Sequence, residues 1–140
     1  MLLTFRFEGK KYAYDSVSGA VIQPDALGFK MMGAIVPPLT PVCPTSLRYE
    51  LAKFDSLDVE EAYNEIYALC AQKVLYCEED NVIRIKTAGE YSFASPALIA
   101  AALGEAFAKL DGAVRFDGND AAKDIASEVA SRLGKDLIFN

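Results

Sequence analysis

Aromatic residues recur at every second position near the start of the chain, in two short runs. The residues concerned are Phe5, Phe7, Tyr12 and Tyr14. A period of two is typical of half-buried strands. Turn-forming residues follow each run, at residues 8–10 and 15–19. We therefore expect a three-stranded meander whose last strand covers residues 20–23, and it needs a helical layer to be stable in water.

Three helices are predicted after the meander, at residues 25–32, 47–54 and 59–72. In the third, apolar residues recur with a helical period from Val59 onward, which is typical of a helix that faces a core. Between the first two helices, residues 36–44 contain four prolines and predict an extended connection. Pro38 and Pro41 have the spacing of a ligand for proline-recognising modules, but a stiff loop explains the stretch more simply.

The second half of the chain alternates between strand and helix patterns. Strands are predicted at residues 74–77, 82–86, 113–116 and 136–139, and helices at residues 97–110 and 121–133. From residue 82 on the order is β-α-β-α-β, which usually forms a small, mostly parallel sheet. The predicted fold class is therefore α+β. We expect one unit at residues 1–80 and a small α/β unit of unknown role at residues 81–140. Two arrangements stay open: the first unit folds alone, or the two units are continuous.

Composition narrows the possible functions. The 140 residues are 52% hydrophobic and 24% charged, as in globular proteins, and the net charge of −6 disfavours nucleic acid as a partner. No apolar run is long enough to cross a membrane and no secretory signal is visible, so we expect a cytoplasmic protein. Cys43, Cys70 and Cys77 are scattered and the chain lacks histidine. This predicts reduced thiols, no metal site, no cofactor and no catalytic triad of the usual kind.

One motif resembles a known family. The stretch from Tyr12 to Val21, YAYDSVSGAV, is similar to the second turn of PqqD-type RiPP recognition elements, above all those fused ahead of radical-SAM peptide maturases. The segment VEEAYNEI that begins at Val59 resembles their third helix. The resemblance covers residues 1–80 and implies a winged-helix-like domain. Such a domain binds the leader peptide of a ribosomally made precursor and presents it to a peptide-modifying enzyme.

The chain departs from this family in two respects. The Cys-x-x-x-Cys-x-x-Cys motif that follows the element in the maturases is absent, so no radical-SAM activity is carried over. The connection between the first two helices is also long and rich in proline. The function implied is non-catalytic, with binding by strand addition to an open sheet edge.

The predicted binding residues are a strand and a facing helix wall: Ala20, Val21, Ile22, Gln23, Tyr63, Ile66 and Tyr67. Glu60, Glu61 and Glu65 on that helix would favour a basic or neutral peptide. Two alternatives stay open. One is a small α/β enzyme or regulatory domain in residues 82–140 that acts through Asp117 or Asp120. The other is a winged-helix DNA-binding protein, which the net charge disfavours.

Overall fold

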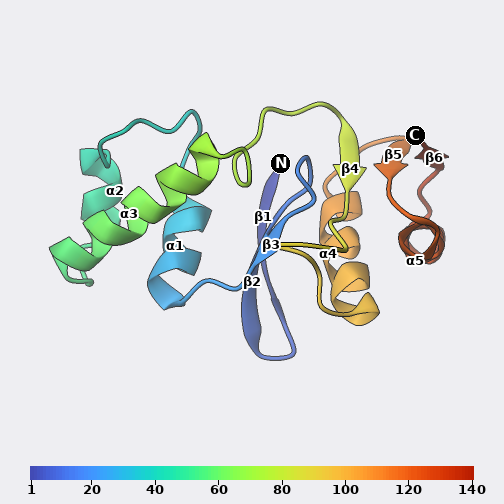
Figure 1. The fold of residues 1–140 in the computed structure, drawn as a ribbon, viewed down its shortest axis with the longest axis horizontal. Coiled ribbons are helices and arrows are strands. Elements are labelled where there is room, and N and C mark those ends of the chain that lie inside the picture. The colour runs from blue at the N-terminus through green and yellow to red at the C-terminus, as the bar shows by residue number, and fades with distance from the viewer.

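A computed structural model describes all of residues 1–140 and shows an α+β protein, as predicted (Figure 1). The first half contains β1 (Leu2–Phe7), β2 (Lys10–Asp15), β3 (Val21–Ile22), α1 (Ala26–Ala34), α2 (Thr45–Glu50) and α3 (Ser56–Ala71). The second half contains β4 (Val82–Arg84), α4 (Pro96–Ala108), β5 (Val114–Asp117), α5 (Asp120–Leu133) and β6 (Leu137–Phe139).

The predicted meander is confirmed as an antiparallel sheet in the order β1-β2-β3. A two-residue turn joins β1 to β2, and both of its residues, Glu8 and Gly9, have positive φ angles of 50° and 76°. This is the hairpin turn whose twist matches that of the flanking strands. The third strand is shorter than predicted, because only Val21 and Ile22 pair with β2.

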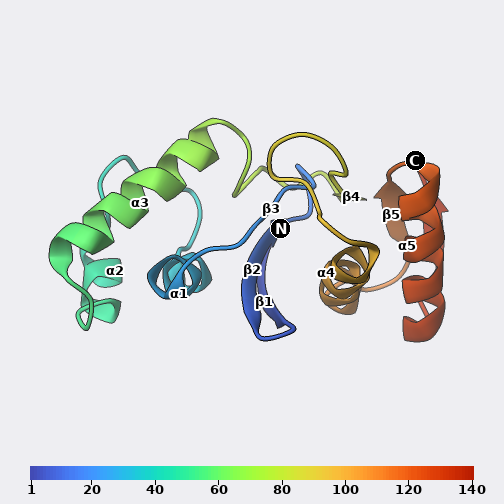
Figure 2. The same ribbon diagram turned by 60° about the horizontal axis from the view of Figure 1, so that its bottom comes forward.

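The antiparallel sheet is covered on both faces. Figure 2 shows the hairpin of β1 and β2 standing between α1 and α4. Leu3, Phe5 and Tyr14 belong to the core on the α4 side, whereas Ala13 belongs to the core on the α1 side. The alternation of strand side chains therefore supplies two separate cores from one sheet.

Helices α1 and α3 begin at aspartate caps, and α3 begins at Ser56, earlier than the predicted start at Val59. The Asp25 carboxylate accepts a hydrogen bond from the Gly28 N–H, and the Asp55 carboxylate accepts bonds from Leu57 and Asp58. Helix α2 is shorter than predicted and ends at Glu50. The apolar stripe of α3 packs on α1 and α2 in a buried cluster that includes Leu27, Met31, Leu47, Val59, Tyr63 and Ile66.

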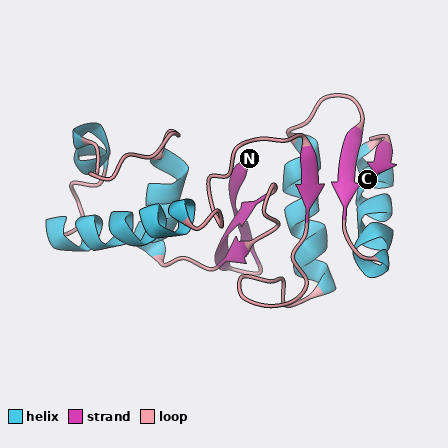
Figure 3. Cartoon of the chain, turned by 45° about the horizontal axis from the view of Figure 1, so that its top comes forward, coloured by secondary structure: helices cyan, strands magenta, loops and turns pink.

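The β-α-β-α-β order is confirmed as a parallel sheet with the strand order β4-β5-β6. Its three arrows point the same way in Figure 3. Ser95 caps α4 with Pro96 in the first turn, and Gly134 ends α5 in the left-handed conformation, as the sequence indicates. Helix α4 packs against α5 and β1 and shares one core with the parallel sheet, so it links the two halves.

One hydrophobic core crosses the predicted boundary at residue 80. Leu3, Phe5, Tyr14 and Val21 from the first sheet pack in one cluster with α4, α5 and the parallel sheet. Backbone hydrogen bonds also cross it: Arg84 N–H donates to Ser16 O at 2.8 Å, and Lys86 N–H donates to Gly19 O at 3.0 Å. The two sheets are separate, but the turn between β2 and β3 is bonded to the edge of the parallel sheet.

That turn has little room. Gly19 has a φ of +81°, and a β-carbon there would lie 2.9 Å from the Lys86 backbone nitrogen. A residue with a side chain would be strained and would push the parallel sheet away. The close approach explains why glycine stands at this point of the motif.

The strand predicted at residues 74–77 is wrong. Lys73 and Tyr76 have positive φ angles of 60° and 54°, which interrupt an extended conformation. Leu75 is fully buried in the α1–α3 cluster, and the Tyr76 hydroxyl donates a hydrogen bond to Met32 O. The apolar run is therefore a tightly anchored turn, and its backbone does not pair with a strand.

Candidate functional site

The edge of β3 that the sequence suggested as a binding site is already occupied. Val21 N–H donates to Tyr91 O at 2.9 Å, so the loop after β4 lies along this edge. Ala20 is buried, and only Gln23 at the end of the segment is exposed. The prediction of an open edge at residues 20–23 is therefore wrong at Val21, because a segment far away in the sequence covers it.

The predicted helix wall is part of the core. Tyr63 and Ile66 are 1% and 3% exposed, and the Tyr63 hydroxyl donates a hydrogen bond of 2.6 Å to Thr40 O in the proline-rich loop. Tyr67 is half-buried against the same cluster, as is Ile22 of β3. The structure thus brings Ile22 and the three α3 residues to one cluster, but as packing partners and not as a free surface.

The other edge of the sheet is open. Along the β1–β2 hairpin, every second residue of β1 exchanges backbone hydrogen bonds with β2, and the residues between them do not. Phe7, opposite Lys10 and next to the two-residue turn, is the first hydrogen-bonded position. The backbone groups of Leu2, Thr4 and Arg6 consequently point away from β2. No hydrogen bond joins the backbone of these three residues to any other part of the chain.

Two hollows lie along this free edge, and no residue of β2 or β3 lines either of them. The first, which we call the α1 hollow, measures about 870 Å³ and adjoins residues 1–4. Its other walls are the end of α1, Pro37 and Pro38, residues 76–79, and Lys109 after α4. Gly33 on α1 faces Thr4 and adds no side chain to the hollow. A β-carbon at Gly33 would meet only the Thr4 hydroxyl, at 3.9 Å.

The second hollow, which we call the α4 hollow, measures about 550 Å³ and adjoins Phe5, Arg6 and Phe7. Its floor consists of small residues of α4: Ala97, Ala100, Ala101 and Gly104. Val129 and Leu133 of α5 extend the apolar lining, and Leu133 is 43% exposed. The free edge of β1 therefore runs beside space on its whole length, flanked by α1 on one face and by α4 on the other.

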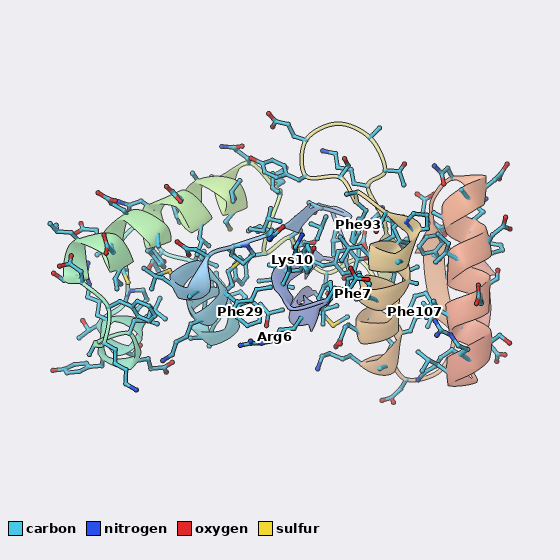
Figure 4. All side chains as sticks on the ribbon, turned by 90° about the horizontal axis from the view of Figure 1, so that it is seen from below. Arg6, Phe7, Lys10, Phe29, Phe93 and Phe107 are labelled. Atoms are coloured by element: carbon cyan, nitrogen blue, oxygen red, sulfur yellow. The ribbon has the colours of Figure 1, made fainter.

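Some charged groups near the free edge form ion pairs, and others do not. Arg6 stands opposite Lys11 in the β1–β2 register, and neither side chain forms an ion pair. The Arg6 guanidinium instead lies 5.4 Å from the centre of the Phe29 ring. Figure 4 shows Arg6 and Phe29 together on the α1 side of the hairpin, and Phe7 on the α4 side. At the other end of β1, the Glu79 carboxylate accepts a hydrogen bond of 2.7 Å from the Met1 amino group.

Cys77 lines the α1 hollow but is not an activated nucleophile. Burial, with a further contribution from the Asp15 charge, raises the pKa of its thiol. The thiol donates a hydrogen bond to Lys73 O at 3.1 Å. A thiol with a raised pKa is mostly protonated at neutral pH and reacts slowly. Cys43 and Cys70 are also unpaired, and burial raises their pKa values too.

The other residues considered from the sequence lie elsewhere. Asp117 and Asp120 are exposed at the end of β5 and the start of α5. Glu60, Glu61 and Glu65 are exposed on α3, where Glu61 and Glu65 share a shallow groove with Asp25 and Asp58. They do not line the free edge of β1. No cluster of three or more potential ligand side chains is arranged to hold a metal ion.

No protein-family model matches this chain, and no curated protein sequence matches it. None of its helices combines the length and the apolar character needed to cross a membrane.

The sequence did contain the alternating pattern that identifies β1, but a pattern within one strand does not say which of its edges stays free.

Proposed function

We propose that the chain binds an extended peptide as a fourth strand along the free edge of β1. The observation that carries the proposal is the row of unpaired backbone groups of Leu2, Thr4 and Arg6 beside two hollows. Such a row is a template for strand pairing, and strand addition is a common mode of peptide recognition. Main-chain hydrogen bonds supply affinity, and the hollows select side chains.

The flanking helices favour a single strand as the occupant. Because α1 and α4 cover both faces of the sheet, an added strand lies between two helical walls (Figure 2). Its side chains point alternately into the α1 hollow and toward the α4 hollow. A second copy of the whole protein would have to bring its own α1 and α4 past the same walls, so a flexible segment fits better than a folded partner.

The biological role that we propose follows from the resemblance in residues 12–21. The bound segment is the leader peptide of a ribosomally made precursor, and the chain acts as a non-catalytic adaptor for a peptide-modifying enzyme, of the radical-SAM class in the most similar versions. A cytoplasmic location suits this role, because all three cysteines are unpaired. The binding edge moves from β3 to β1, since β3 is covered by the loop that contains Tyr91.

Replacing Thr4 with proline is expected to weaken peptide binding at least about ten-fold. The Thr4 N–H points away from β2, so proline removes no bond of the hairpin but leaves one peptide carbonyl without a donor. The probe is a fluorescently labelled synthetic peptide, Ser-Val-Thr-Leu-Asp-Leu-Thr-Val-Ser, with anisotropy as the readout. Circular dichroism establishes that the variant is folded.

The matched control is Thr4→Val, which keeps the backbone donor and should bind as the parent does. A second measurement uses the same peptide with N-methyl groups on alternate amides. One set of alternate methyl groups should abolish binding and the other should not, because only every second amide of an added strand faces β1. Equal tolerance of both sets would contradict strand addition. A dimer of the protein that Thr4→Pro dissociates would contradict the peptide as the occupant, because it would show that a second copy pairs with the edge.

A further inference from the structure

We infer that the free edge of β1 selects a peptide with an acidic residue between two apolar ones, placed opposite Arg6. This inference rests on the proposed strand addition to β1. In this inference, the α4 hollow binds a bulky apolar side chain of the peptide. Arg6 and Lys11, which are cross-strand neighbours without an ion pair, bind a carboxylate of the peptide. The glutamates on α3 favoured a basic or neutral peptide in the sequence analysis, but they lie away from this edge.

The lining of the α4 hollow is mostly apolar and suits an apolar side chain; its charged members are Arg6, Glu105 and Arg132. Ala100, Ala101 and Gly104 keep its floor low, and the rings of Phe5 and Phe7 form its side. A β-carbon built on Gly104 would have no neighbouring atom within 4 Å, so the hollow is open at this point. A strand residue opposite Phe5 or Phe7 points toward the same face of the sheet as these rings and therefore toward α4.

The other face of the sheet, toward α1, carries positive charge at the position of Arg6. Arg6 and Lys11 are direct cross-strand neighbours, and like charges in this arrangement destabilise a sheet. Neither forms an ion pair, and the Arg6 guanidinium lies over the ring of Phe29 on α1. A strand residue opposite Arg6 points to this face. A carboxylate there would compensate the two positive charges.

Strand geometry joins the two observations into one motif. Consecutive residues of a strand point to opposite faces, so the residues on either side of the acidic one point toward α4. The pattern apolar–acidic–apolar reads the same in both directions. It therefore holds whether the peptide runs parallel or antiparallel to β1.

The test compares three peptides on three forms of the protein. The first peptide is Ser-Val-Thr-Leu-Asp-Leu-Thr-Val-Ser, the second has Lys in place of Asp, and the third has Ala in place of both Leu residues. The unaltered protein should bind the first at least about five-fold tighter than the second and about ten-fold tighter than the third. Arg6→Glu should weaken the preference for Asp over Lys or reverse it.

Gly104→Leu fills the α4 hollow without removing any contact. Leucine is a better helix former than glycine, so this variant is expected to fold at least as well as the parent. It should bind the Leu peptide about ten-fold more weakly while its affinity for the Ala peptide stays the same. Ala108→Leu is the matched control, because Ala108 is exposed on the same helix and does not line the α4 hollow; this variant should bind the Leu peptide as the parent does.

The outcomes separate this inference from the proposed function. If all three peptides bind equally and Thr4→Pro abolishes the binding, strand addition stands and the selectivity is overturned. If no peptide binds, or if Thr4→Pro has no effect, strand addition fails and the selectivity falls with it. Binding of the Leu peptide to Gly104→Leu at undiminished affinity would remove the α4 hollow from the site.

Discussion

Residues 1–80 expressed alone are expected not to fold. The side chains of Leu3, Phe5, Tyr14 and Val21 are at most 7% exposed, and their packing partners on the other side of the sheet lie beyond residue 80. Exposing a large apolar side chain costs about 1.5–3 kcal/mol. Four such losses are comparable with the whole stability of a typical domain, about 5–15 kcal/mol.

The measurement is thermal and urea unfolding followed by circular dichroism, for the fragment and for the full chain. The full chain should unfold in one cooperative transition, and the fragment should show none. A cooperative transition of the fragment at a similar temperature would show that the α1–α3 core is sufficient for folding. The crossing core would then be only an interface between two independent domains.

Asp15→Ala is expected to destabilise the protein by about 3 kcal/mol or more, the largest effect that we expect from a single substitution. Asp15 is fully buried, and its carboxylate accepts hydrogen bonds from Val17, Ser18 and Cys77 N–H at 2.9, 3.1 and 3.0 Å. Leaving one fully buried donor unsatisfied costs about 1–3 kcal/mol, and alanine leaves three partly buried donors. Urea unfolding of the full chain gives the change directly.

The adjacent residue provides the control. Ser16 is also fully buried, but its hydroxyl has no hydrogen-bond partner, so Ser16→Ala should change stability little or increase it. Asp15→Asn should lie between the two, because its amide oxygen still accepts bonds but its NH₂ group does not. A similar effect of Asp15→Ala and Ser16→Ala would mean that volume alone matters at this turn.

The sequence predicted the elements whose signals are local. Asp25, Ser95 and Gly134 define helix ends through bonds or conformations within a few residues, and the structure has each helix end where these residues place it. The run at residues 74–77 failed for a physical reason. The apolar character of Leu75 and the ring of Tyr76 reflects their packing in the α1–α3 core. A short apolar run of this kind does not reveal whether its backbone is extended or forms a turn.

The location of the proposed site could not be predicted for a similar reason. A three-stranded meander has two edge strands, β1 and β3, and their sequences do not say which edge stays free. Tyr91 closes the β3 edge from 70 positions farther along the chain than Val21, as the bond from Val21 N–H to Tyr91 O shows. Long-range contacts of this kind leave no periodic signal in the sequence.

The turn between β2 and β3 has a consequence for the motions of the protein. Backbone bonds from this turn reach Met1 on one side and Arg84 and Lys86 on the other, and the Ser18 hydroxyl donates to Val74 O. A segmental opening of either half must break this turn first. The amides of Ser16, Arg84 and Lys86 should therefore exchange with deuterium at one common slow rate, whereas independent opening of the halves would give them different rates.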